Sequence, residues 1–225
     1  CLNKTRGGHS PPFYYLMSIF MISKIVLASN NAGKLVEFER LLAPLSIAVQ
    51  AQSAFNVPDC DEPFHTFVEN ALHKARHTAR HTGLPALADD SGVCVPALNG
   101  APGVFSARYA SLFIPVLNPD LDKDTQNNLQ LIKNLRTVAD KTAYYYCVLV
   151  LVRHADDPQP IICDGQWWGQ VVDIPQGDNG FGYDPYFFVP TLNMTAAQMS
   201  KEQKNTISHR AIAVQALIKK LKGEH

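Results

Sequence analysis

The spacing of apolar and polar residues predicts strands that alternate with helices in the first half of the chain. Short apolar runs have the length of strands at 24–29, 47–52 and 85–88. After the first run, leucines and Phe38 follow helical spacing until Pro44. The stretch 66–82 places Phe67 and three alanines on one helical face, and Gly83 follows as a helix-ending residue. This half therefore has the pattern of an α/β protein.

The second half predicts a helix, a pair of long strands and a final helix. Helical spacing over 120–139 is followed by two runs, 143–153 and 160–174, which we interpret as a β-hairpin. A further short strand ends at Pro190, and 208–221 is an amphipathic helix with lysines in its last turn. We predict an α/β fold with a long central mixed β-sheet, helices on both sides and two lobes that frame a cleft.

The composition is that of a folded globular protein. Of 225 residues, 46% are hydrophobic and 18% are charged, and the formal net charge is +0, which suits one sizeable domain. A neutral balance without a dominant basic run argues against a nucleic-acid-binding protein. The most apolar stretch, 143–152, is shorter than the roughly 20 residues that a membrane-spanning helix needs. We therefore expect neither nucleic acid nor membrane as a partner.

The cysteines and the first residues bear on where the protein works. The five cysteines are scattered and form no C-x-x-C pair, which indicates a reducing, cytoplasmic setting rather than a disulfide framework or a zinc knuckle. Residues 1–16 lack the apolar core and cleavage site of a signal peptide, and Met17 or Met21 would be a natural start. We expect 1–16 to be an N-terminal extension outside the fold, and 17–225 to form a single domain.

A polar turn after the first predicted strand has the features of an anion-binding loop. It consists of Ser29, Asn30, Asn31, Ala32, Gly33 and Lys34. A glycine-containing turn exposes backbone N–H groups at a helix N-terminus, where the dipole favours phosphate, and Lys34 adds a positive charge. The turn lacks the second glycine and the Lys-Ser/Thr pair of a P-loop, so an ordinary turn is the alternative interpretation.

Two adjacent carboxylates, Asp89 and Asp90, follow a buried strand and precede Ser91 and Gly92. We expect them at the end of this strand, where α/β proteins bind ligands. Adjacent residues of a strand point to opposite faces, so one carboxylate would face the cleft and the other the interior. Carboxylate oxygens suit Mg²⁺, which also binds substrate phosphates. A plain acidic turn is the alternative.

Two later segments concentrate further candidate groups. In the glycine-rich run that contains Phe181, Gly182, Tyr183 and Asp184, an aromatic ring between glycines could stack on a base, or the rings could simply fill the core. Near the last helix, Lys204, His209 and Arg210 gather hydrogen-bond donors at a positive helix end, or form only a basic helix start.

Other tempting residues have simpler explanations. His73, His77 and His81 share one helix face and could bind zinc, but Lys74, Arg76 and Arg80 alternate with them, so we favour a solvated cationic face. One of Trp167 and Trp168 should point inward and the other outward. Cys94 and Cys147 fall in apolar strands and are expected to be inert core thiols.

Taken together, these fragments resemble a known family, the inosine triphosphate pyrophosphatases, also called XTP/dITP diphosphatases. The resemblance extends over about 24–220 and rests on SNNAGK, TFVENALHKA, LPALADDSG, APGVFSARYA, GFGYDP and ISHRA. It implies a homodimeric, Mg²⁺-dependent enzyme that hydrolyses non-standard purine nucleoside triphosphates (ITP, dITP, XTP) to the monophosphate and pyrophosphate, with the nucleotide bound in the cleft between the lobes.

The resemblance also implies roles for individual residues. The loop from Ser29 to Lys34 would hold the triphosphate, with Lys34 as its charge partner in catalysis. Asp90 would be general base and metal ligand, and Glu62 would share the Mg²⁺, although Asp61 and Glu69 lie close in sequence. The remaining positions match contacts to the substrate, and they are Ser91, Phe181, Gly182, Tyr183, Asp184, Lys204, His209 and Arg210.

Two other functions are compatible with parts of this pattern. A Maf-type pyrophosphatase would act on other modified or pyrimidine nucleotides, but GFGYDP and ISHR favour a purine substrate. A nucleotide-sensing protein would bind without turnover, and such a protein could dispense with the carboxylates of Asp90 and Glu62. Both alternatives are settled by assaying substrates with different bases.

Overall fold

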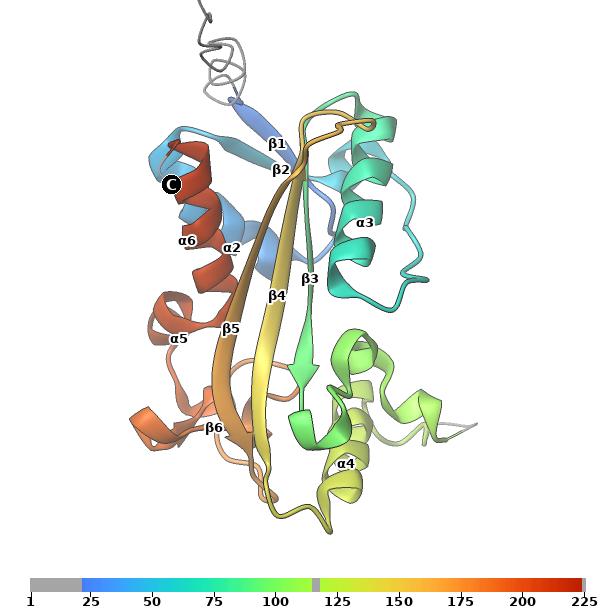
Figure 1. Ribbon diagram of the computed structural model, residues 1–225, viewed down its shortest axis with the longest axis vertical. Coiled ribbons are helices and arrows are strands. Elements are labelled where there is room, and N and C mark those ends of the chain that lie inside the picture. The colour runs from blue at the N-terminus through green and yellow to red at the C-terminus, as the bar shows by residue number, and fades with distance from the viewer. Residues whose placement is uncertain (1–21, 115–117, 224–225) are drawn as a thin grey trace, which may run out of the picture.

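The computed structural model describes residues 22–114 and 118–223, and its centre is one seven-stranded sheet (Figure 1). The strands lie in the order β2-β1-β3-β4-β5-β6-β7. Their bounds are β1 Lys24–Leu27, β2 Ala48–Ala51, β3 Ala86–Cys94, β4 Thr142–Val152, β5 Ile161–Val171, β6 Phe187–Val189 and β7 Met194–Thr195. The helices are α2 Ala32–Leu42, α3 Phe67–Thr82, α4 Lys123–Leu135, α5 Lys201–Ile207 and α6 His209–Leu221.

The sheet is mixed, as predicted. Strand β1 pairs in parallel with β2 and β3, whereas β3, β4, β5, β6 and β7 pair in antiparallel fashion. The α/β class and the helices that flank the sheet are therefore confirmed. The expected extension, 1–16, lies outside the described residues.

Alternation along the strands assigns each helix to one face of the sheet. Leu87 and Leu149 belong to a core cluster with Phe38 of α2 and Leu217 of α6. Ala88 and its neighbours on that face pack instead against the alanine stripe of α3. Because neighbouring strand residues point to opposite faces, α2 and α6 cover one face and α3 covers the other (Figure 1).

The long strands β4 and β5 continue beyond α3 and α6 toward the lower end of the molecule in Figure 1. There a separate core cluster joins Val93, Leu131 of α4, Trp167 and Phe187. Trp167 is 6% exposed and Trp168 is 51% exposed. This confirms the prediction that one of the two tryptophans points inward and the other outward. This end of the sheet carries Tyr183 of the glycine-rich segment and Tyr109 of APGVFSARYA.

Four features differ from the prediction. The acidic pair does not end a strand, because β3 continues to Cys94 and each residue of 86–94 pairs with β4. The helix predicted over 120–139 is shorter, because Asp122 caps its start by accepting the Thr125 N–H. The pattern did not reveal α5, which begins at a Ser200–Gln203 capping box, nor the two-residue strand β7.

Candidate functional site

The polar turn 29–34 forms the N-terminus of α2. The Asn31 side chain caps the helix by accepting the Lys34 N–H at 3.1 Å, and the Ser29 hydroxyl accepts the Asn31 N–H at 3.2 Å. These bonds hold Asn31 in an extended conformation, and the turn is largely exposed. The sequence-predicted cradle is therefore a capped helix N-terminus open to an anion.

Asp89 joins this cradle to the last helix. Its carboxylate is buried, with Oδ1 2.9 Å from Lys34 Nζ and Oδ2 3.3 Å from Arg210 Nη2. Arg210 also reaches Glu37 Oε2 at 3.1 Å. Although burial alone would raise the pKa of Asp89, the cations of Lys34 and Arg210 hold it below its ordinary value. Asp89 is therefore an ionised anchor for two cations.

Asp90 lies on the opposite face, with Lys74 and Glu62. Lys74 Nζ of α3 is 2.6 Å from Glu62 Oε1 and 3.5 Å from Asp90 Oδ1. Arg108 approaches Glu62 from the other side, with Nη1 3.7 Å from Oε2. The structure thus brings together the two carboxylates that the sequence proposed as metal ligands, and it inserts a lysine between them.

The other two acidic candidates lie away from this centre. Glu69 accepts a hydrogen bond from the Thr66 hydroxyl at 2.5 Å, and this pair belongs to the N-terminal cap of α3. The Asp61 side chain is exposed and lies outside the ion pairs around Lys74 that the described residues form. Glu62 is the residue of this acidic loop that reaches Lys74.

Burial controls the ionisation of this acidic centre. It raises the pKa of the Asp90 carboxyl to about 6; Lys74 opposes the rise and Glu62 adds to it. Burial would lower the pKa of Lys74, but Asp90, Asp89 and Glu62 outweigh it and raise that pKa above its ordinary value. At neutral pH the centre is a protonated lysine between carboxylates, with Asp90 close to its titration range.

The acidic centre fits a hard divalent cation. Asp90 Oδ2 is buried and has no hydrogen-bond partner among residues 22–114 and 118–223. Mg²⁺ is commonly held by one or two carboxylates and completes its shell with waters and substrate phosphates. Asp90 and Glu62 provide such a donor set, with Asp90 Oδ2 as the oxygen that the protein leaves unused.

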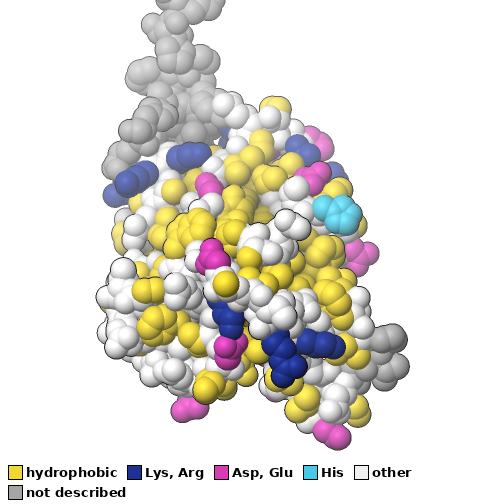
Figure 2. Space-filling model, turned by 60° about the horizontal axis from the view of Figure 1, so that its bottom comes forward, with side chains coloured by type: hydrophobic (Ala, Val, Ile, Leu, Met, Phe, Trp, Pro, Cys, Tyr) yellow, Lys and Arg dark blue, Asp and Glu magenta, His cyan; other side chains and the backbone are white. Residues whose placement is uncertain are grey.

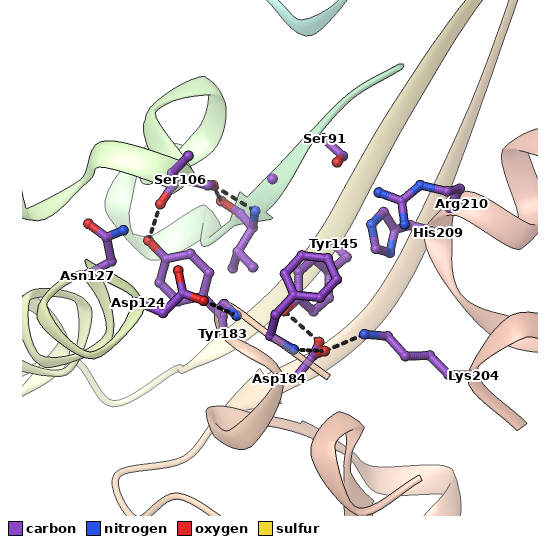
Figure 3. Close-up of a pocket in the computed structure, with 15 residues that line it drawn as sticks. Ser91, Ser106, Asp124, Asn127, Tyr145, Tyr183, Asp184, Lys204, His209 and Arg210 are labelled. Carbon is purple, nitrogen blue, oxygen red and sulfur yellow. Dashed lines mark hydrogen bonds and ion pairs between the residues drawn. The ribbon is translucent and has the colours of Figure 1, made fainter. Parts of the chain in front are cut away.

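A pocket opens on the Asp89 side of β3, where Arg210 lines it, and its other walls come from α4, α5 and the start of α6 (Figure 3). Figure 2 shows that the lower end of the molecule is hollowed, with Lys and Arg side chains beside apolar ones. All eight substrate-contact residues proposed outside the cradle line the pocket, namely Ser91, Phe181, Gly182, Tyr183, Asp184, Lys204, His209 and Arg210. Three segments far apart in sequence therefore meet at one site.

The two aromatic rings of the glycine-rich segment behave differently. Tyr183 is buried and its hydroxyl donates to the Ser106 carbonyl at 2.8 Å, so this ring supports the pocket wall from within. Phe181 is 62% exposed, and Lys204 Nζ lies 5.4 Å from the centre of its ring. Phe181 is the ring of this segment that is free to stack on a planar group.

His209 and Asp184 form the floor of the pocket. The His209 ring stacks on Tyr145 with centroids 4.7 Å apart and an interplanar angle of 9°. Burial and the neighbouring cations of Arg210 and Lys204 lower the pKa of His209 well below its ordinary value, so the imidazole is neutral. Asp184 is almost fully buried and forms an ion pair with Lys204.

Sequence reasoning missed several residues of this site, and Lys74, Glu37 and Tyr145 are the most informative of them. It placed Lys74 on the cationic outer face of α3, but Lys74 lies beside the buried alanines Ala71 and Ala75, and that position was the available signal. It assigned no role to Glu37 or Tyr145, because their partners on α6 and in 181–184 are distant in the chain.

Fold and site together define a class. It is that of α/β proteins whose cation-lined cleft, next to paired carboxylates, suits a nucleotide. Comparison with known proteins narrows this class. The model of the Ham1 family matches residues 25–220, and the chain belongs to this family.

Close relatives and solved structures agree with this assignment. The chain is 60% identical to a dITP/XTP pyrophosphatase of Neisseria meningitidis serogroup B over 198 residues, which is 88% of this chain and 96% of the relative. It is 57% identical to a dITP/XTP pyrophosphatase of Ralstonia nicotianae, with the same coverage of both chains. A HAM1 protein from Coxiella burnetii superposes with a TM-score of 0.82 at 46% identity, covering 89% of this chain and 98% of its own.

Proposed function

We propose that this protein hydrolyses non-standard purine nucleoside triphosphates (ITP, dITP and XTP) to the monophosphate and pyrophosphate. The observation that carries the proposal is that Asp89 joins Lys34 of the helix-capped cradle to Arg210, which lines the pocket. The next residue of β3, Asp90, lies with Lys74 and Glu62. A triphosphate in the cradle and a base in the pocket would place the phosphoanhydride bonds along this part of β3. The names of the relatives support this choice of substrate.

The residues of the centre account for attack of water on the α-phosphorus. Asp90 accepts a proton from the attacking water. Lys34 and Lys74 offset the charge on the phosphate oxygens as pyrophosphate leaves. Products are the monophosphate, pyrophosphate and one proton.

We propose Mg²⁺ as the cofactor, held by Asp90 and Glu62. When bound, the ion supplies positive charge that polarises the phosphate groups. The pair of carboxylates and Asp90 Oδ2, which is buried and has no hydrogen-bond partner in the described part of the chain, support this assignment. Hypoxanthine and xanthine would be selected by donors that face their 6-oxo group, and Lys204 and Arg210 are our candidates, since adenine would leave these donors unpaired.

The decisive experiment measures pyrophosphate release with Mg²⁺ from ITP, XTP, ATP, GTP and TTP, for the wild type and for Asp90→Asn. We expect strong release from ITP and XTP that the substitution abolishes. Preference for TTP would favour a Maf-type pyrophosphatase, and ITP binding without release would favour a sensor. Either outcome would contradict the proposed reaction or its base.

We further propose that the protein works as a homodimer, as the family resemblance implies, and in the cytoplasm, as the scattered cysteines indicate. The exposed Trp168 on β5 is a candidate contact. Sedimentation velocity of the wild type and Trp168→Ala tests the assembly, and a wild-type monomer at all concentrations would contradict it.

Among residues 22–114 and 118–223, none of the helices has the length and apolar character to span a membrane.

A further inference from the structure

Tyr145 connects two walls of the pocket that are separate in sequence. Its ring stacks on His209, at the start of α6, and its hydroxyl donates to Asp184 Oδ1 at 2.9 Å (Figure 3). Behind it, Trp167 and Phe187 pack with centroids 6.1 and 4.6 Å away. Tyr145 is 8% exposed. The side chain is therefore held firmly by the core on one side, while the other face of its ring and its hydroxyl contact residues of the pocket.

The Asp184 carboxylate depends on this hydroxyl. Asp184 Oδ2 accepts the Phe181 N–H at 3.0 Å and the Lys204 ammonium, whereas Tyr145 is the side chain that donates to Oδ1. A buried carboxylate that loses a donor must move or take up a proton, because the unpaired oxygen is costly. Either response would disturb Phe181 and Lys204, because both donate hydrogen bonds to Asp184 Oδ2.

We propose that Tyr145 is a positioning residue that sets base preference, by holding Asp184 and His209 in one fixed relation. This inference rests on the proposed function, because it assumes that the pocket takes the base. The hydroxyl acts through Asp184 on the stacking ring of Phe181 and the ammonium of Lys204. Burial, together with Asp184, raises the pKa of Tyr145 well above its ordinary value, so the hydroxyl stays protonated as a donor at every working pH.

Tyr145→Phe removes the hydroxyl and retains the ring that stacks on His209. We expect the KM for ITP and XTP to rise about tenfold to a hundredfold, as loss of one hydrogen bond to a charged group predicts, with kcat within twofold. The preference for ITP over ATP should fall by a similar factor. Tyr109→Phe is the matched control, because Tyr109 is equally buried and its hydroxyl accepts from Asn134 at 2.7 Å, outside the pocket lining.

A double variant tests whether the hydroxyl acts through Asp184. In an Asp184→Asn background, adding Tyr145→Phe should change KM by less than twofold. Effects that multiply, or a Tyr145→Phe protein with wild-type KM and base preference, would overturn the inference. Thermal unfolding of each variant checks that the fold survives, which we expect because the ring and its packing are retained.

Measurements of nucleotide binding test this inference separately from the proposed reaction. Calorimetric titration of ITP and ATP into Asp90→Asn, with and without Tyr145→Phe, reports base preference without turnover. If the wild type released no pyrophosphate but Tyr145→Phe weakened ITP binding relative to ATP, the reaction would fail and the positioning role would stand. An unchanged ratio of the two dissociation constants would overturn the positioning role alone.

Discussion

Asp89 and Asp90 are consecutive residues of β3, and their carboxylates serve opposite faces of the sheet. Asp89 holds Lys34 and Arg210 on the side of α2 and α6, whereas Asp90 faces Lys74 of α3. Their pKa values move in opposite directions, since cations lower that of Asp89 and burial raises that of Asp90. One strand thereby supplies a permanent anion to the scaffold and a second carboxylate that, in the proposed reaction, accepts a proton.

The Asp90 carboxylate should destabilise the metal-free protein at neutral pH. Its pKa of about 6 lies above the ordinary 3.8, so between these values the folded state binds more protons and stability falls as pH rises. The ionised carboxylate therefore costs roughly 3 kcal/mol above pH 6. We expect Asp90→Asn to raise the free energy of unfolding in urea at pH 7.5, with EDTA present, and the gain to vanish toward pH 4.

A matched control for this prediction is Asp156→Asn, because the Asp156 side chain is 92% exposed. It should leave stability unchanged within about 0.5 kcal/mol at both pH values. An Asp90→Asn protein that is no more stable than the wild type at pH 7.5 would refute the assignment of a strained, ionised carboxylate.

Lys74 should be needed for turnover and not for base preference. Its ammonium lies between Glu62 and Asp90 and outside the residues that line the base pocket. Loss of one such charged donor typically lowers kcat by about 10²- to 10³-fold. We expect Lys74→Met to show this loss on ITP, with the ITP-to-ATP ratio retained. Lys141→Met is the control, because Lys141 pairs with an exposed carboxylate, Asp173, and should keep full activity.

Lys34 should act on the phosphates rather than on the base. We expect Lys34→Met to weaken binding of both ITP and inorganic tripolyphosphate by about tenfold or more, since one charge-assisted contact is lost. Isothermal titration with each ligand measures the effect. Arg40→Met, at an exposed position of the same helix, should bind both ligands like the wild type. Weaker binding of ITP with unchanged binding of tripolyphosphate would contradict the cradle.

Gly165 allows α6 to lie directly on β5. A Cβ at this position would come within 2.2 Å of the His209 carbonyl oxygen and 2.8 Å of Ala213 N. Gly165→Ala should therefore push α6 away and lower the free energy of unfolding by about 1–3 kcal/mol. It should also raise KM for ITP, because His209 and Arg210 begin this helix. Gln166→Ala, whose exposed side chain points away from α6, should change neither quantity.

Local signals predicted the elements better than their ends. The alanine stripe of α3 and its Gly83 cap are properties of neighbouring residues, so periodicity sufficed. The acidic pair looked like a strand end because Asp, Ser and Gly are typical of turns. It lies inside β3 because nine residues of this strand pair with β4, a contact between residues about 60 positions apart.

From the sequence alone, the α/β class, the motifs and the family resemblance could be determined, because strand and helix periods and short motifs are local. The tertiary structure decided how the motifs combine. It directed Asp89 and Asp90 to different helices, selected Glu62 over Asp61 and Glu69 as the partner of Lys74, and set Tyr145 between Asp184 and His209. These relations depend on burial and on contacts between distant segments, and no local pattern encodes either.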